Sequence, residues 1–130
     1  MKLRSALAAV TLLVLAVPVS AGAREPSLLQ LLADPSRYEG RKVLVTGYCR
    51  LEFQGTAIFL HKQDYTHTLA HHLWLVFPPA SITAKIKNID YCLVEGVFKP
   101  KNKGHMSLYR GAIENITRYE PWPPTPARKR

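Results

Sequence analysis

Four of the chain's five histidines fall within one short stretch, HKQDYTHTLAHH, at positions 61–72. These candidate metal ligands are His61, His67, His71 and His72. Imidazole nitrogens bind zinc, and one helical turn would place His67 and His71 on a common face, with another histidine as third ligand. The spacing matches no zinc motif such as H-E-x-x-H, however, and Asp64 is the only carboxylate nearby. Since the stretch lies between two predicted strands, a solvated loop is the stronger interpretation and a metal-binding loop the weaker one.

The sequence offers little support for catalysis. It contains no G-x-S-x-G elbow, phosphate-binding glycine loop or H-E-x-x-H motif. A carboxylate pair for acid–base chemistry needs one partly buried member, but Glu52 and Glu95 fall on the outward faces of predicted strands. A nucleophilic cysteine needs a thiolate, which cysteines joined in a disulfide do not provide. We therefore predict no catalytic residues, no cofactor and a protein that is not an enzyme.

Basic residues are the stronger chemical clue. The chain has 18 lysines and arginines against 9 aspartates and glutamates, which gives a net charge of +9 with neutral histidines. Such an excess favours anionic partners, such as nucleic acid, anionic lipid, envelope polymer or an acidic protein surface. Lys99, Lys101 and Lys103 alternate within the stretch KPKNKGH and form a candidate anion-binding cluster. Loop lysines are also commonly just solvated, so this cluster alone does not identify a ligand.

The first 23 residues have the order of a secretory signal peptide. Two basic residues precede an apolar run at 6–19, and the small residues Ala-Gly-Ala follow at 21–23. The apolar run is shorter than the roughly 20 residues that a membrane-spanning helix needs. The sequence therefore predicts cleavage before Arg24 and a periplasmic or secreted mature chain without a transmembrane segment.

The residues after the predicted cleavage site are organised as short elements separated by turns. The stretch 42–53 alternates between two faces, which is typical of a strand with one side on a core. Ser27 before LLQLLA predicts a short capped helix, which Asp34-Pro35 ends, and SRYEG then forms a turn. The predicted strands are 42–53, 56–62, 73–77, 90–98 and 106–118, with a second short helix at 81–88 before the fourth strand.

Two predicted strands share a pattern, KVLVTGYC and YCLVEGVF. Each places a glycine, Gly47 or Gly96, between residues that face the core, as a tightly coiled barrel strand requires. Cys49 and Cys92 then fall on the same interior side. Antiparallel pairing of the two strands would bring the cysteines opposite each other, and an exported chain matures in an oxidising compartment. We expect a disulfide between them, with two buried free thiols as the alternative.

Three strands, a helix and two further strands are the arrangement of an OB-fold, a five-stranded Greek-key barrel. We therefore predict a mainly β protein with one OB-fold-like domain at 24–120. A Pro-rich basic tail follows at 121–130. An open sandwich or meander of the same strands is the alternative architecture.

A resemblance to a group of known proteins rests on four stretches of the sequence. These are DPSRYEGRKVLVTGYCRLEF, FLHKQDY, YCLVEGVF and GAIENITR. With them the chain resembles a largely uncharacterised group of small exported bacterial proteins with an OB-fold-like domain. The resemblance covers residues 28–118, nearly the whole predicted mature chain. It implies the fold and the class, and it transfers no catalytic or binding residue because its motifs are ordinary for barrel strands.

OB-folds bind ligands in a cleft formed by the loop after strand one, the loop between strands four and five, and the outer face of strands two and three. Tyr48 and Arg50 point outward on the first strand by alternation, and Trp74 on the third strand is a further candidate. The candidate ligand-binding residues are therefore Tyr48, Arg50, Trp74, Lys99, Lys101 and Lys103.

These observations predict a non-catalytic exported binding module that recognises a protein or an anionic envelope ligand. Single-stranded nucleic acid is one alternative ligand, since aromatic rings beside cations suit it. Metal binding through the 61–72 loop is another. An exported protein meets little nucleic acid, and a shared fold does not establish a shared function, so we favour the first interpretation.

Overall fold

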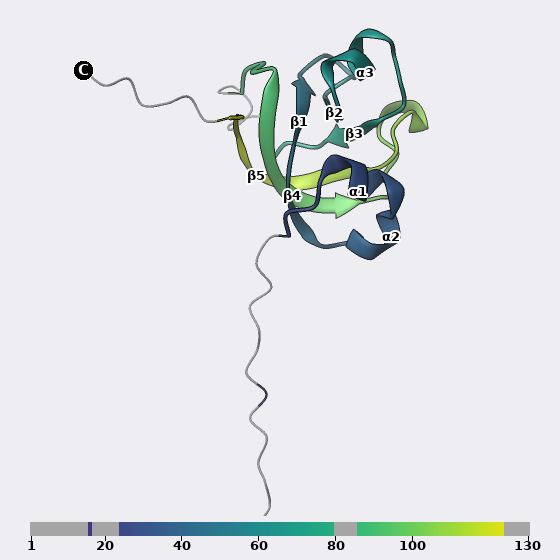
Figure 1. Ribbon diagram of the computed structural model, residues 1–130, viewed down its shortest axis with the longest axis vertical. Helices are drawn as coiled ribbons and strands as arrows, with labels where there is room; N and C mark the ends of the chain where they lie inside the picture. The colour runs from purple at the N-terminus through teal and green to yellow at the C-terminus, as the bar shows by residue number, and fades with distance from the viewer. Residues whose placement is uncertain (1–15, 17–23, 80–85, 124–130) are drawn as a thin grey trace, which may run out of the picture.

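The computed structural model describes residue 16 and the ranges 24–79 and 86–123 (Figure 1). The predicted signal peptide, apart from residue 16, lies outside these residues, as does the part of the predicted tail after residue 123. Most of the predicted helix at 81–88 also lies outside them, and the described residues 86–89 are not helical. No helix in the described ranges combines the length and the apolar character needed to cross a membrane.

Five strands close into a barrel in the order β1-β2-β3-β5-β4. The strands are β1 (Lys42–Arg50), β2 (Ala57–Phe59), β3 (His72–Leu75), β4 (Tyr91–Lys99) and β5 (Ala112–Pro121). β3 and β5 run parallel, whereas every other neighbouring pair runs antiparallel. This strand order defines a small OB-fold-like barrel and confirms the predicted fold class.

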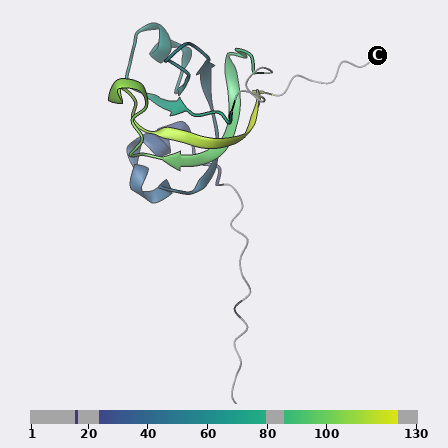
Figure 2. The same ribbon diagram turned by 180° about the vertical axis from the view of Figure 1, so that it is seen from behind.

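Short helices flank the barrel. They are α1 (Leu28–Ala33), α2 (Pro35–Tyr38), α3 (Lys62–Thr66) and the 3-10 turn η1 (His105–Ser107). α1 and α2 lie together on one side of the barrel, and α3 lies on the other side in both views (Figure 1, Figure 2). The η1 turn belongs to the β4–β5 loop, which lies next to the loop that follows α3 (Figure 2).

α1 forms where the sequence predicts it. The Ser27 hydroxyl accepts the amide of Gln30, and the Gln30 side chain accepts the amide of Ser27, which completes a capping box. Leu28 and Leu31 are buried in the barrel core. The chain then forms α2 instead of the predicted turn, because Pro35 suits the first position of a helix.

The inward-facing residues of all five strands form one apolar core with α1 and α2. Alternation along β1 places every second side chain in this core, as the sequence pattern predicts. The buried core residues are Leu28, Leu31, Tyr38, Val43, Val45, Cys49, Ile58, Leu73, Leu75, Cys92, Val94, Phe98, Ile113 and Ile116.

Two glycines let neighbouring strands approach closely enough for the barrel to close. A Cβ atom at position 47 would lie 2.5 Å from the carbonyl oxygen of Phe59 on β2. A Cβ atom at position 96 would lie 2.6 Å from the carbonyl oxygen of Glu114 on β5, at a point where the register between β4 and β5 shifts. Gly47 and Gly96 therefore each admit the backbone of a neighbouring strand, which confirms their predicted role in a tightly coiled barrel.

Gly47→Ala is expected to destabilise the protein by about 1–3 kcal/mol, since the added methyl group overpacks a site that backbone and core atoms already fill. Gly55→Ala is the matched control, because a Cβ atom there would lie no closer than 3.5 Å to its neighbours. Equilibrium denaturation of the oxidised protein measures both effects. Equal stability of the two variants would contradict the role of Gly47 in close packing.

A disulfide joins Cys49 on β1 to Cys92 on β4, as predicted. Both cysteines are fully buried, and their Cα atoms lie 5.9 Å apart. They are diagonal neighbours rather than directly opposite, because Cys92 pairs with Gly47 and the amide of Cys49 donates to the carbonyl of Asp90. The bond therefore links two adjacent barrel strands within the core.

The double variant Cys49→Ala/Cys92→Ala is expected to lose about 4 kcal/mol of unfolding free energy, since the bond closes a loop with a sequence separation of 43. Denaturation with and without reductant measures this loss. Reductant should destabilise the parent protein and leave the double variant unchanged. A parent protein that is indifferent to reductant would contradict a stabilising bond.

Each predicted strand begins or ends at another residue than expected. β2 ends at Phe59 instead of 62, β3 covers 72–75 instead of 73–77, and β4 covers 91–99 instead of 90–98. β1 ends at Arg50, and Phe53 lies in the following turn with 93% of its surface exposed. β5 begins at Ala112 rather than at 106, and it continues past its predicted end. Met106 and Ser107 have left-handed φ values of 53° and 57°, which a strand does not accommodate.

Candidate functional site

The outer faces of β1, β2 and β3 carry two rows of side chains. One row is Tyr48, Phe59 and His72, and the other is Arg50, Ala57 and Trp74. Residues directly opposite each other on neighbouring strands share a face, and the intervening Cys49, Ile58 and Leu73 belong to the core. Tyr48 and Arg50 therefore lie on the outer face, as alternation predicts, and Trp74 lies on the same face.

Tyr48 is nevertheless covered, which corrects the expectation that a ligand contacts its side chain. Only 3% of its surface is exposed. Its ring lies 5.9 Å from the ring of Tyr65 in α3 and 5.5 Å from the ring of Tyr91 at the start of β4. Since α3 packs over this part of the outer face, Tyr48 supports other aromatic side chains and does not reach the surface itself.

Aromatic rings form a continuous chain across the outer face, with 4.7 to 5.9 Å between consecutive ring centroids. In order, the rings are Tyr91, Tyr48, Tyr65, Phe59, His72, Tyr109 and Trp74. Several pairs meet edge to face, at 74° for Phe59 and Tyr65 and at 84° for His72 and Tyr109. This geometry is favourable for aromatic pairs, so the chain of rings holds α3 and the β4–β5 loop on the barrel.

A cleft of about 390 Å³, here called the aromatic cleft, opens above these rings. Its lining residues are Glu52, Gly55, Phe59, Tyr65, Thr68, Leu69, Ala70, His72, Leu108 and Tyr109. They come from the β1–β2 turn, from α3 and the loop after it, from β2 and β3, and from the β4–β5 loop. These are the surfaces on which OB-folds bind ligands, and the volume is within the range of ligand pockets.

His72 joins two walls of the aromatic cleft. Its Nδ1 lies 3.1 Å from the carbonyl oxygen of Leu69, and its Nε2 lies 3.3 Å from the carbonyl oxygen of Leu108. A neutral imidazole carries a single N–H, so its ring donates to one of these carbonyls while it contacts the other. The ring also packs 5.1 Å from Phe59 and 4.7 Å from Tyr109. His72 therefore connects the loop after α3 to the β4–β5 loop.

Asp64 organises the histidine-rich stretch. Its side chain is buried; Oδ2 accepts the amide of His61 at 2.8 Å, and Oδ1 lies 2.7 Å from Nδ1 of His71. The carboxylate thereby caps α3 and ties it to the residues before β3. The predicted solvated loop is wrong for Lys62–Thr66, which form a helix anchored by this buried carboxylate.

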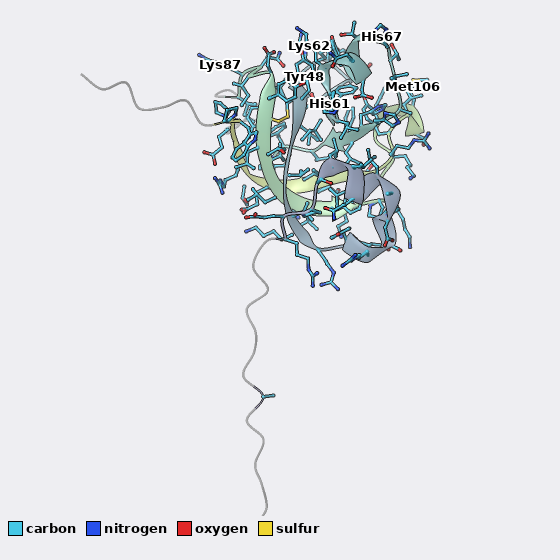
Figure 3. All side chains as sticks on the ribbon, viewed as in Figure 1. Tyr48, His61, Lys62, His67, Lys87 and Met106 are labelled. Carbon is cyan, nitrogen blue, oxygen red and sulfur yellow. A yellow bond between two sulfur atoms is a disulfide. The ribbon has the colours of Figure 1, made fainter. Side chains whose placement is uncertain are left out.

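The candidate metal ligands are spread apart by this arrangement. His61 and His67 lie at opposite ends of α3 (Figure 3), and His71 contacts Asp64. His72 contacts main-chain carbonyls instead. In the described parts of the chain, no group of three or more histidine, cysteine, aspartate or glutamate side chains is placed to hold a metal ion. What the stretch does contribute is a wall of the aromatic cleft.

Asp64→Ala is expected to destabilise the protein by about 1–3 kcal/mol, since it removes a buried carboxylate and leaves the amide of His61 and the ring of His71 without their acceptor. Hydrogen exchange of the amides at 61–72 should accelerate more than exchange in the barrel strands. Gln63→Ala is the matched control, because Gln63 is exposed on the same helix. Unchanged exchange in the Asp64 variant would contradict an anchoring role.

Glu52, at the β1–β2 turn, is held by two neighbouring side chains. The Tyr65 hydroxyl donates to Oε1 of Glu52, and Nε of Arg50 lies 3.6 Å from the same oxygen. The Arg50 guanidinium also lies 5.2 Å from the centroid of the Tyr65 ring. The hydrogen bond to Glu52, together with burial, raises the pKa of Tyr65, and burial raises the pKa of Tyr109. Both phenols therefore stay protonated at neutral pH.

The three predicted lysines do not form one cluster. Lys99 is exposed at the end of β4, and Nζ of Lys101 lies 3.6 Å from the Glu39 carboxylate. Nζ of Lys103 donates to the carbonyl oxygen of Arg110 at 3.2 Å. Lys103 and Arg110 line a second hollow of about 310 Å³, here called the basic hollow. The residues that it shares with the aromatic cleft are Ala70, Leu108 and Tyr109.

Most residues that line the aromatic cleft are not predicted from the sequence. Tyr65 and Leu69 fall in the predicted loop, and Leu108 and Tyr109 fall in a stretch predicted as strand. Phe59 lies in a predicted strand, and alternation is enough to place its side chain on the outward face. Its position beside the other rings depends on the register with neighbouring strands, which one strand alone does not reveal. The missed residues come mainly from connections, where periodicity carries little information.

The fold and the cleft define a small OB-fold-like barrel with a candidate ligand site on its outer face. Among known proteins, no family model, curated protein or solved structure matches the chain. The chemistry of the aromatic cleft is therefore the basis for a functional assignment.

Proposed function

We propose that the protein is a non-catalytic, exported binding module that recognises a protein or an anionic ligand through the aromatic cleft. The observation that carries this proposal is an aromatic floor on the outer face of β2 and β3, bordered by two connecting loops. This is the place where OB-folds receive extended ligands, and aromatic linings are typical of binding sites.

Exposed apolar side chains at the cleft support a macromolecular ligand. Leu69 and Leu108 line the cleft with 46% and 63% of their surfaces exposed. Met106, in the adjacent η1 turn, is 76% exposed and lies at the edge of the molecule (Figure 3). Apolar side chains that gather around a cleft mark an interaction site, whereas apolar residues scattered singly do not.

The polar groups of the cleft support binding rather than catalysis. Glu52 is held by Arg50 and Tyr65, and the ring nitrogens of His72 face main-chain carbonyls. Tyr65 and Tyr109 keep their protons at neutral pH. A general base or an activated nucleophile needs a free group next to the substrate, whereas the protein itself engages Glu52, Tyr65 and His72.

The disulfide suits export, and the main-chain bridge at Arg24 is compatible with the predicted cleavage. A buried disulfide suits an oxidising compartment. Arg24, the predicted first residue of the mature chain, already pairs with β1: its amide donates to the carbonyl of Lys42 at 3.0 Å, and its carbonyl accepts the amide of Leu44 at 2.7 Å. A chain cleaved before Arg24 retains this bridge.

Charge substitution of the cleft leucines tests the proposed function. The probes are peptides selected from a random displayed library on the full chain, and an oligothymidylate as polyanion. Leu69→Glu and Leu108→Glu are each expected to weaken probe binding about tenfold, since each substitution places an unpaired carboxylate where the bound probe would cover apolar surface. Fluorescence anisotropy measures the dissociation constants.

Leu29→Glu is the matched control for this experiment. Leu29 is 58% exposed on α1 and lines neither the aromatic cleft nor the basic hollow. Its substitution introduces the same charge and should leave binding unchanged. If every probe binds both cleft variants as tightly as the parent protein, the aromatic cleft is not the binding site.

A further inference from the structure

The aromatic cleft and the basic hollow are adjacent, and Leu108 and Tyr109 line both. Resting on the proposed function, we infer that the ligand is an acidic protein segment with an aromatic side chain. The ring enters the aromatic cleft, and the carboxylates that follow it lie over Lys103 and Arg110. One short segment occupies both hollows because they share a border.

The aromatic cleft is suited to a ring. Phe59, Tyr65, His72 and Tyr109 contribute four aromatic side chains to its lining. Two pairs among them already meet edge to face, at 74° and 84°. A guest ring that joins them extends the arrangement that aromatic side chains prefer, with large apolar contact and few rotatable bonds to fix.

The charges around the two hollows are asymmetric. At the β1–β2 turn, the Glu52 carboxylate is matched by Arg50 at 3.6 Å. At the β4–β5 loop, Lys103 and Arg110 line the basic hollow, and neither forms an ion pair with a carboxylate of the described residues. Nζ of Lys103 instead donates to a main-chain carbonyl. Charge complementarity therefore selects a ligand with anionic groups next to its ring.

An acidic protein segment fits this surface better than single-stranded nucleic acid does. Nucleic-acid binding uses a row of cations along the phosphate backbone and ring faces on which successive bases stack. Here Lys101 is paired with Glu39, and the Glu52 carboxylate lies in the lining of the cleft. Two cations beside one aromatic pocket suit carboxylates that follow a single ring.

Short fluorescent peptides test the inference on the full chain. The first has one phenylalanine followed by aspartates. The second has lysines in place of the aspartates, the third has alanine in place of the phenylalanine, and an oligothymidylate is the fourth probe. Fluorescence anisotropy should show the first peptide binding most tightly, with affinity about fivefold or more lower for the second and the third.

Charge reversal locates the carboxylates. Lys103→Glu and Arg110→Glu are each expected to weaken binding of the acidic peptide about fivefold, and added salt should reduce this difference. Lys87→Glu is the matched control, because Lys87 is exposed and lies across the molecule from Met106 (Figure 3). It should leave the affinity unchanged.

The outcomes separate this inference from the proposed function. Equal binding of the acidic and basic peptides, or insensitivity to reversal of Lys103 and Arg110, overturns the acidic ligand. The cleft remains a binding site in that case if Leu108→Glu weakens both peptides. Tighter binding of the oligothymidylate overturns the inference in favour of nucleic acid. If Leu108→Glu weakens no probe, or if no probe binds, the inference and the proposed function both fail.

Discussion

The close crossing of strands at Gly47 and Gly96 sets the geometry on which the rest of the molecule depends. Because neither position carries a Cβ atom, β2 approaches β1 and β5 approaches β4 closely enough for a short sheet to close on itself. Closure separates an inner face from an outer face along every strand. Cys49 therefore faces the core, while its neighbours Tyr48 and Arg50 face outward. The apolar core and the outer layer of aromatic rings both follow from this constraint.

The outer layer is shaped more by connections than by strands. β2 and β3 have only 3 and 4 residues, so the segments that join them to the rest of the barrel cover much of their outer face. Asp64 fixes the first of these segments through His61 and His71 and thereby positions Tyr65 over the sheet. Histidines that look like metal ligands in the sequence thus serve to hold an aromatic wall in place.

Local sequence patterns predict the barrel, but they do not predict which residues form the aromatic cleft. Alternation and the repeated glycine pattern around Gly47 and Gly96 are properties of single strands, so they indicate curvature and the inner face without knowledge of register. The cleft depends on which residues meet across strands, as Phe59 and His72 do, and register is not visible in one strand. α3 also escapes sequence reasoning, because a helix of 5 residues shows little periodicity and rests on a buried carboxylate whose burial the sequence does not reveal.

The parallel pairing of β3 with β5, here called the seam, is the shortest strand pairing in the barrel. It consists of 2 residue pairs, Trp74 with Ala112 and Leu75 with Ile113. The loops that line the cleft are the segments leading into these two strands, and His72 bridges them at the seam. A ligand that contacts both loops therefore holds β3 and β5 together. Ligand binding and the pairing of β3 with β5 are then thermodynamically coupled. The bound ligand stabilises the strand pairing, and the paired state binds the ligand more tightly.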